Sequence, residues 1–292
     1  MLVGGWPLRR RSGARRRQAS GVGPGNARRR PEVLGYFSGL MTTLTAPDLL
    51  GQALLDYHHG QAAATLTVHC NAADDEPLPA AYFFRTLLQM PELERGALDE
   101  CRGRVLDLGA GAGCHALELQ SRQFEVKAVD ISAGAVQVME ARGVQAVARH
   151  DLFAPRPATE RPYDTILLLM NGLGLTGTLD GLDRFLAHAR TLLAPDGQIL
   201  ATSSDVSYLY EDEDGALVLD LNGPYYGEIE YTLSYQNRTG EPFPWLFIDA
   251  ALLNDAAAAA GYQADFLDED AEGQYLVRLT PVGLAKPANQ AI

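Results

Sequence analysis

The chain has 292 residues, of which 47% are hydrophobic, so it can bury the core of one large α/β domain or two small ones. Its formal net charge is −13. Residues 1–40 contribute +8, from nine arginines and one acid, and the rest of the chain therefore carries −21. Such an acidic surface repels a phosphate backbone, and the apolar runs are too short to cross a bilayer. We expect no nucleic-acid partner and no membrane partner.

Residues 1–40 are rich in Arg, Gly and Pro and have no hydrophobic period, which predicts a disordered basic arm. Three interpretations remain open: an arm that binds nucleic acid, an organelle transit peptide, or a stretch that is not part of the natural protein. Met41 favours the third, because the sequence after it resembles an ordinary protein start.

The cysteines and histidines indicate neither a disulfide framework nor a metal site. Cys70, Cys101 and Cys114 form no pair at a metal-binding spacing, and we interpret them as reduced thiols of a cytoplasmic protein. His58–His59 and His69 match no common metal-ligand spacing, so no metal is expected.

The segment 41–103 is predicted to form N-terminal helices ahead of the main domain. Apolar residues recur at helical spacing over Pro47–Gly60, and two further helices, Pro79–Gln89 and Pro91–Glu100, begin with proline. Leu66–Cys70 is ambiguous between helix and strand.

From Arg104 the pattern alternates between short apolar runs and amphipathic runs. This alternation predicts βαβ units and an α/β fold: a Rossmann-like, mostly parallel sheet of seven strands with helices on both faces. The predicted strands are Arg104–Leu108, Glu125–Val129, Val144–Ala148, Thr165–Met170 and Gln198–Thr202. The predicted helices between them are Cys114–Ser121, Ala133–Arg142 and Leu179–Leu193.

The rhythm changes after the fifth strand. Residues 206–247 alternate with period two and are rich in tyrosine, which predicts an antiparallel hairpin inserted into the domain of residues 104–292. A helix ended by Gly261 and two closing strands complete the chain.

The stretch RVLDLGAGAGCHALEL, residues 104–119, places three glycines between a strand and a helix. Glycine allows the backbone to approach a ligand closely, and a helix N-terminus favours an anion or a nucleotide. The dinucleotide fingerprint G-x-G-x-x-G requires glycine at position 114, where this chain has Cys114.

With this turn, the sequence resembles the class I S-adenosylmethionine-dependent methyltransferases. The stretch VLDLGAGAG resembles their first motif, Asp130 closes the second strand in VKAVDIS, and Asp151 follows the third strand in ARHDLF. YDTILLLMNGLG and LLAPDGQIL are similar to the fourth strand and to the turn into the fifth. The resemblance covers residues 80–205 well and the N-terminal helices and the hairpin poorly.

The resemblance implies S-adenosyl-L-methionine as cofactor and assigns positions around it. The glycine turn would face the methionine part, with Asp107 near its amino end, and Asp130 would hold the ribose hydroxyls. Asp151 would bond the adenine amino group, and His115 would meet the cofactor carboxylate or the substrate. The predicted cofactor-binding residues are Asp107, Gly109, Ala110, Gly111, Gly113, Asp130, Ile131, Asp151, Leu152 and Asn171.

Two further groups are candidates for the substrate side of the site. Asn171 ends the fourth strand and starts Asn-Gly-Leu-Gly, where family members that methylate nitrogen often carry D/N-P-P-Y; we expect it, like His115, to orient substrate or cofactor. Tyr208, Tyr231 and Trp245 of the hairpin are candidate substrate contacts, and the N-terminal helices would cover the cofactor and substrate site.

These features favour a methyltransferase that acts on a small-molecule acceptor by in-line displacement. Alternatives are a protein methyltransferase, an aminopropyl transferase, an NAD-dependent oxidoreductase, and a non-catalytic module that binds the cofactor or a partner protein. The sequence indicates neither the methylated atom nor the oligomeric state.

Overall fold

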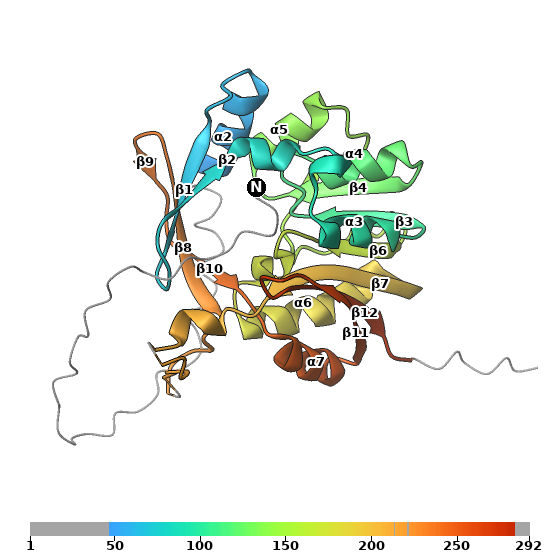
Figure 1. Ribbon diagram of the computed structural model, residues 1–292. Helices are drawn as coiled ribbons and strands as arrows, with labels where there is room; N and C mark the ends of the chain where they lie inside the picture. The colour runs from blue at the N-terminus through green and yellow to red at the C-terminus, as the bar shows by residue number, and fades with distance from the viewer. Residues whose placement is uncertain (1–46, 213, 221, 284–292) are drawn as a thin grey trace, which may run out of the picture.

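The computed structural model describes residues 47–212, 214–220 and 222–283. The predictions for residues 1–40 and for Met41 lie outside this part of the chain. The described residues form two sheets, which we call the main sheet and the cap sheet, and Figure 1 shows the cap sheet standing at one end of the main-sheet strands.

The main sheet has seven strands, and the five strands in its middle and at one side run parallel. The last two strands of the chain pair antiparallel at the other side. This arrangement confirms the predicted α/β fold. In spatial order the strands are β11 (Tyr262–Glu269), β12 (Gln274–Pro281), β7 (Leu193–Ser204), β6 (Tyr163–Leu168), β3 (Arg104–Leu108), β4 (Glu125–Asp130) and β5 (Val147–Arg149).

Both faces of the main sheet are buried, which explains why its strands are continuous apolar runs. Val105 of β3 contributes to the core under α3, α4 and α5, whereas its neighbour Leu106 contributes to the core under α6 and α7. In Figure 1, α4 and α5 lie beside β4 in the upper part of the view, and α6 and α7 lie beside β7, β12 and β11 in the lower part. The helices are α3 (Glu92–Asp99), α4 (Cys114–Ser121), α5 (Ala133–Ala141), α6 (Leu179–Leu192) and α7 (Ala250–Ala259).

Side-chain caps mark where several of these helices begin. Ser132, Thr178 and Asp249 each accept a hydrogen bond from a backbone N–H in the first turn of α5, α6 and α7. These local signals place the helices within a residue or two of the predicted bounds.

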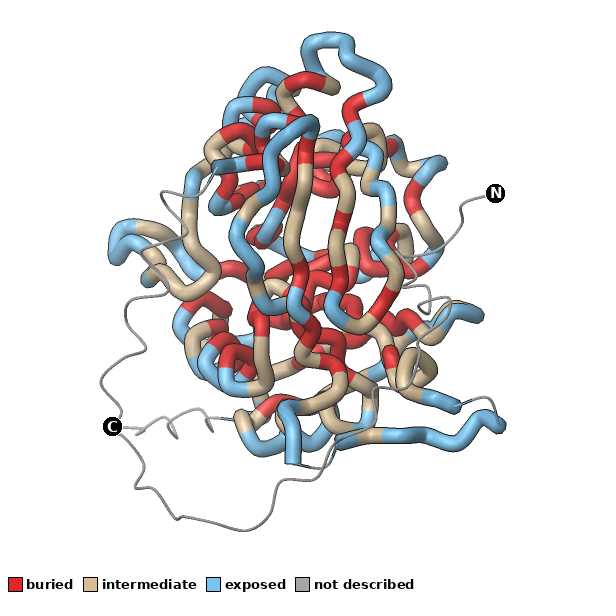
Figure 2. The backbone as a smooth tube through the Cα atoms, turned by 90° about the vertical axis from the view of Figure 1, so that its left-hand side faces the viewer, coloured by how far each residue is buried: buried red, intermediate tan, exposed pale blue. Residues whose placement is uncertain are grey.

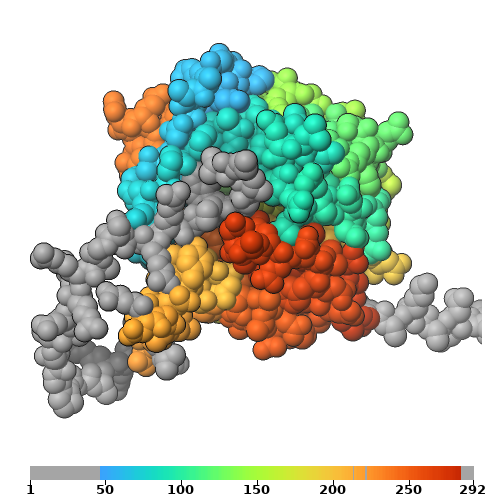
Figure 3. All heavy atoms as spheres, in the orientation of Figure 1, coloured from blue at the N-terminus to red at the C-terminus, as the bar shows by residue number. Residues whose placement is uncertain are grey.

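The cap sheet corrects two expectations. Residues 47–103 are not only helical, because β1 (Thr65–Cys70) and β2 (Glu76–Pro79) form an antiparallel pair; the predicted helix Pro79–Gln89 is two 3₁₀ turns, η1 (Ala80–Phe84) and η2 (Leu87–Gln89). The insertion is not a hairpin on its own, because β8 (Glu228–Tyr235) pairs with β1 as well as with β9 (Arg238–Thr239) and β10 (Phe243–Leu246). Figure 3 shows these two segments, cyan and orange, meeting on one face.

The period-two burial of β1 explains why Leu66–Cys70 was ambiguous. Leu66, Val68 and Cys70 are buried while the residues between them are partly or fully exposed, as Figure 2 shows for the strands of the cap sheet. Three alternating apolar residues are too few to exclude a helix, and the partner strand lies about 160 residues later in the chain.

Asp48 attaches the N-terminal segment to the main domain. One carboxylate oxygen accepts the Gly51 N–H at the start of α2 (Leu49–His58), at 2.8 Å. The other oxygen accepts the Ser132 hydroxyl and the Gly134 N–H at the start of α5, at 2.8 and 2.9 Å. A single carboxylate therefore caps two helices, and α2 is fixed beside the loop that follows β4.

Among the described residues no helix has the length and apolar character needed to span a membrane. Cys70, Cys101 and Cys114 are buried, and within the described part of the chain none of them forms a disulfide.

Candidate functional site

The glycine turn lies between β3 and α4, at the edge of the main sheet where the parallel strands end, which we call the carboxyl edge. The backbone N–H groups of Gly109 and Ala110 both donate to the Val129 carbonyl, at 2.9 and 3.1 Å, so the turn is tied to β4. Gly109 and Gly111 have φ of +69° and +55°, a region that disfavours residues with a Cβ. A Cβ on Gly111 would lie 3.0 Å from Phe83, and one on Gly109 would lie 2.6 Å from Leu175.

Asp107 presents a buried carboxylate oxygen to this turn. The side chain is 2% exposed; a hydrogen bond from the Ala116 backbone helps to hold it, yet its Oδ2 atom has no partner. Burial raises the pKa of Asp107 to about 6, and the positive charge of His115 opposes that rise. A buried carboxylate oxygen without a partner is costly, and a ligand that donates a hydrogen bond there would recover that cost.

His115 belongs to a buried ion network and does not face the site as a free base. Its Nε2 lies 2.7 Å from Glu94, and both Glu94 oxygens accept from the Nη2 of Arg85, at 3.0 and 2.9 Å. Burial lowers the pKa of His115, but Cys114 and Glu94 raise it by more, so the ring is protonated. Glu94 therefore competes with the cofactor carboxylate for the His115 ring that was predicted to bind it.

Arg85 is the residue of this network that remains available. Its Nε donates to the Tyr82 carbonyl and its Nη2 to Glu94, but its Nη1 is buried without a partner. Arg85 lies between η1 and η2, within the predicted N-terminal helices that were expected to cover the site. An isolated arginine in a loop gives no sequence signal for a binding role of its own.

Asp130 ends β4 next to the glycine turn. Its two oxygens accept the backbone N–H groups of Gly111 and Ser132, at 2.9 and 2.8 Å. Burial raises the pKa of Asp130, while those two backbone hydrogen bonds oppose the rise. The Ile131 backbone also bonds this carboxylate, which can accept about four hydrogen bonds in all, so capacity remains for a ligand hydroxyl. The Ile131 side chain is 42% exposed, as a residue that contacts a flat ligand would be.

Of the residues that were predicted around adenine, Asp151 is half-buried and Leu152 packs toward the core. Asp151 follows β5 and is half-buried, with its Oδ1 bonded to the Phe153 N–H at 2.8 Å. Leu152 lines a small separate cavity on the α6 face of the sheet, together with Leu106 and Val129. Leu152 therefore contributes to the core beneath the loop, and the Phe153 ring lies against Arg184.

Asn171 occupies a strained turn at the end of β6. Met170 and Asn171 have φ of +61° and +56°, and consecutive left-handed residues other than glycine are costly. The Asn171 N–H donates to the Thr202 hydroxyl at 2.9 Å, and its Oδ1 accepts from the Ser204 hydroxyl at 2.8 Å. Gln274 lies opposite Ser204 on the neighbouring strand, and its buried amide nitrogen has no hydrogen-bond partner. The sequence pattern did not single out Gln274.

The three aromatic candidates of the insertion lie in one apolar cluster on the cap sheet, which we call the aromatic cluster: Tyr208, Tyr231, Phe243, Trp245 and Phe247. Tyr231 is buried, whereas Tyr208, Phe243 and Trp245 are half-buried. The indole of Trp245 packs on Gly174 in η3 (Gly172–Thr176), where a Cβ would overlap the ring. The sequence therefore identified residues that lie together, although the strand β1 that completes their sheet was not predicted.

The carboxyl edge fits an adenosyl amino acid. Asp107, just before the glycine turn, has an unpartnered acceptor, and Arg85, which is linked through Glu94 to His115 just after the turn, has an unpartnered donor. No group of His, Cys, Asp or Glu that could hold a metal ion occurs among the residues that the structure describes.

Comparisons with known proteins show the family to which the chain belongs. Residues 81–264 match the family model described as a methyltransferase domain. A solved S-adenosylmethionine-dependent methyltransferase from Bacteroides fragilis, in complex with S-adenosyl-L-homocysteine, is 44% identical, with 80% of this chain and 95% of that chain covered and a TM-score of 0.75. The CcbJ methyltransferase from Streptomyces caelestis shares the fold at 16% identity, with coverage of 66% and 90% and a TM-score of 0.50.

No curated protein matches the chain. The family model covers more than half of the sequence, and the Bacteroides protein covers four fifths of it at high identity. The cofactor of this family is S-adenosyl-L-methionine, and the chain belongs to the class I S-adenosylmethionine-dependent methyltransferases.

Proposed function

We propose that this enzyme methylates a small-molecule acceptor at the carboxyl edge of the main sheet, beneath the cap sheet. The observation that carries the proposal is the pair of unpartnered groups beside the glycine turn, Asp107 Oδ2 and Arg85 Nη1. They match the ammonium and the carboxylate of an α-amino acid, which are present together in the methionine part of the cofactor.

In this proposal the residues divide the work of binding and alignment. Arg85 receives the cofactor carboxylate, Asp107 receives the ammonium, and Asp130 holds the ribose hydroxyls. Asp151 lies on the adenine side with Ile131, and Asn171 orients the acceptor. When bound, the cofactor supplies a methyl group already activated by the sulfonium, so the protein contributes mainly proximity and orientation.

The assignment of Arg85 to the cofactor carboxylate and of Asp107 to the cofactor ammonium is tested with two nucleosides. S-adenosylhomocysteine carries the amino acid, and 5′-methylthioadenosine lacks it. We expect Arg85→Gln and Asp107→Asn each to weaken S-adenosylhomocysteine binding by roughly 10- to 100-fold, about 1.5–3 kcal/mol, because each removes a charge-assisted hydrogen bond. Binding of 5′-methylthioadenosine should change little.

Arg278→Gln is the matched control, because Arg278 also has a buried nitrogen without a partner but lies on β12 near α3. Equal losses for both nucleosides in the Arg85 and Asp107 variants would contradict the assignment.

The class of acceptor is tested separately. The acidic composition and the position of the cap sheet, which contacts the loop after β6 through Trp245, support a small molecule over a nucleic acid. The enzyme is incubated with isotope-labelled S-adenosylmethionine and a cell extract, which is then separated by size. We expect the label in the small-molecule fraction; label confined to protein would support the alternative of a protein methyltransferase.

A further inference from the structure

The aromatic cluster has the geometry of a binding surface as well as a packed core. Tyr231 lies at its centre, with ring centroids of Phe243, Trp245 and Phe247 at 6.2, 6.1 and 6.3 Å. Phe243 and Trp245 stand on one face of β10, opposite Tyr231 and Ile229 of β8. Because both are half-buried, part of each ring is open to a ligand.

Trp245 is connected to the glycine turn by two consecutive residues. The indole of Trp245 packs on Gly174, and the next residue, Leu175, packs on Gly109. Trp245 and the glycine turn therefore pack against neighbouring residues of one short loop, so that Trp245 lies on the acceptor side of the proposed site.

The charge around the aromatic cluster is one-sided. Residues 205–249 contain ten acids and a single basic residue, Arg238, which is exposed on β9. Arg85 lies outside the cap sheet, is paired with Glu94 and is assigned to the cofactor carboxylate in the proposed function. A carboxylate or phosphate on the acceptor would find only the exposed Arg238 within this segment, whereas a cation would find an excess of acids and aromatic faces.

We propose that Trp245, with Tyr231 and Phe243, binds an ammonium group of the methyl acceptor, so that the acceptor is an organic amine. This inference rests on the proposed function and adds the chemical class of the acceptor. The faces of Trp and Tyr attract a cation through their ring quadrupoles, and the attraction is stronger where water is excluded. The proposal concerns how the acceptor is recognised and leaves open which of its atoms is methylated.

The test uses enzyme loaded with S-adenosylhomocysteine and matched sets of small molecules. Each set contains an amine, an alcohol and a carboxylate on the same phenyl, cyclohexyl or hexose body, and calorimetry measures the binding of each compound. In at least one set we expect the amine to bind 10-fold or more tightly than the alcohol, and the carboxylate to bind weakest. Equal binding of the three, preference for the carboxylate, or no binding by any amine would overturn the proposal.

Variants separate recognition from folding. Trp245→Leu should reduce amine affinity by roughly 5- to 30-fold, the magnitude of a cation–π contact, while Trp245→Phe should keep most of it. Phe266→Leu removes an aromatic side chain that is 41% exposed on β11 and should change nothing. Binding of S-adenosylhomocysteine should be unchanged in all three variants, so its loss throughout would count against the proposed function and not against this inference alone.

Discussion

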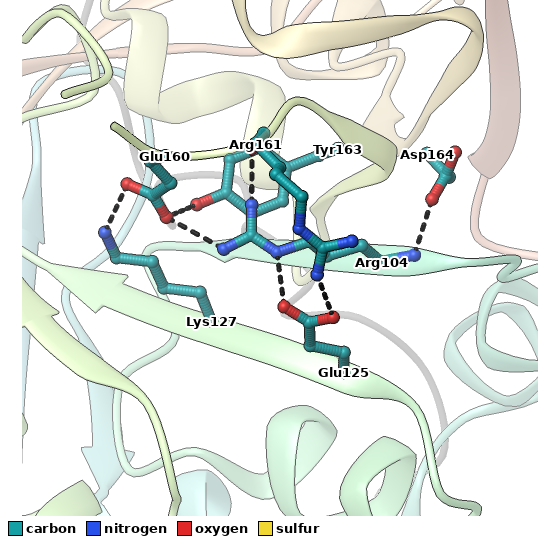
Figure 4. A network of polar contacts seen from close by, with 7 residues as sticks. All are labelled: Arg104, Glu125, Lys127, Glu160, Arg161, Tyr163 and Asp164. Atoms are coloured by element: carbon teal, nitrogen blue, oxygen red, sulfur yellow. Dashed lines mark hydrogen bonds and ion pairs between the residues drawn. The ribbon is translucent and has the colours of Figure 1, made fainter. Parts of the chain in front are cut away.

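The charged side chains at the two edges of the main sheet differ in how completely they are paired. At the amino edge, where the parallel strands begin, Arg104 bonds Glu125 at 2.8 Å and Glu160 at 3.0 Å, and Lys127 bonds Glu160 at 2.9 Å (Figure 4). Tyr163 adds a hydrogen bond to Glu160. At the carboxyl edge the charges are more deeply buried, and Asp107 and Arg85 each keep an atom without a partner.

The difference separates a structural network from a binding site. At the amino edge Glu125 and Glu160 each have basic side chains beside them, and Asp164 accepts the backbone N–H of Arg104. The network ties β3, β4 and the residues at the start of β6 together. At the carboxyl edge one atom of Asp107 and one atom of Arg85 stay buried without a hydrogen bond, a cost that a ligand can recover. Arg156 and Arg278 each have one unpartnered nitrogen too, so it is the combination of an acceptor and a donor of opposite charge that points to a ligand.

The largest expected effect is on stability, at Glu94. Glu94→Gln removes the acid that pairs with Arg85 and His115 and leaves the buried Arg85 guanidinium without an anion, which should cost about 3–5 kcal/mol of unfolding free energy. Glu125→Gln, at an exposed position of the amino edge, should cost less than about 1 kcal/mol. Chemical denaturation of both variants measures the contrast, and equal losses would break the distinction between the two edges.

The second effect is on the ligand, at Asp130. Asp130→Ala should weaken binding of S-adenosylhomocysteine by about 1–3 kcal/mol, because hydrogen bonds from the ribose hydroxyls to a charged group are lost. Calorimetry measures the loss, with Glu160→Gln as the control from the amino edge. An unchanged affinity in a folded Asp130→Ala protein would remove the ribose assignment.

Most of the main domain was predictable because its signals are local. The α4 helix, Cys114–Ser121, was predicted residue for residue, and Asp107, Asp130 and the glycines follow a spacing that is fixed by the strand–turn–helix geometry. Edge strands were less accurate: β5 has only three residues, so few apolar positions define it.

The cap sheet and the ion network were not predictable, because their contacts join distant parts of the chain. β1 becomes a strand by pairing with β8, and Glu94 and His115 come together from different helices. Likewise, no sequence pattern reveals that Arg85 keeps one unpartnered nitrogen, since this depends on what Glu94 and the Tyr82 carbonyl leave free.

A third prediction uses pH at the carboxyl edge. The folded pKa of Asp107 is raised to about 6, so acidification protonates it and removes the acceptor for an ammonium group. Binding of S-adenosylhomocysteine should be constant above about pH 7 and fall by up to tenfold per unit below 6. The profile should flatten in Asp107→Asn, and 5′-methylthioadenosine should show no such dependence. A wild-type affinity that stays constant down to pH 5 would contradict this role.

The smallest expected effect is on the stability contributed by Glu160 at the amino edge. The pKa of Glu160 is shifted in the opposite direction to that of Asp107. Burial raises the pKa of Glu160, but Lys127, Tyr163 and Arg104 lower it by more, to about 2. Because this folded pKa lies below the ordinary value of 4.5, the stabilisation is complete above pH 4.5 and is lost as the pH falls toward 2.

Glu160→Gln should therefore cost about 1 kcal/mol of unfolding free energy at pH 7, the scale of a partly exposed ion-pair network, and less at pH 3. For Asp107 the raised pKa means that its ionised form destabilises the fold, so Asp107→Asn should stabilise the ligand-free protein at pH 7 and lose that advantage as the pH falls below 6. Denaturation of both variants at the two pH values measures these slopes. If the difference in unfolding free energy between variant and wild type changed with pH in the same direction for both variants, the proposed contrast between the two edges would be wrong.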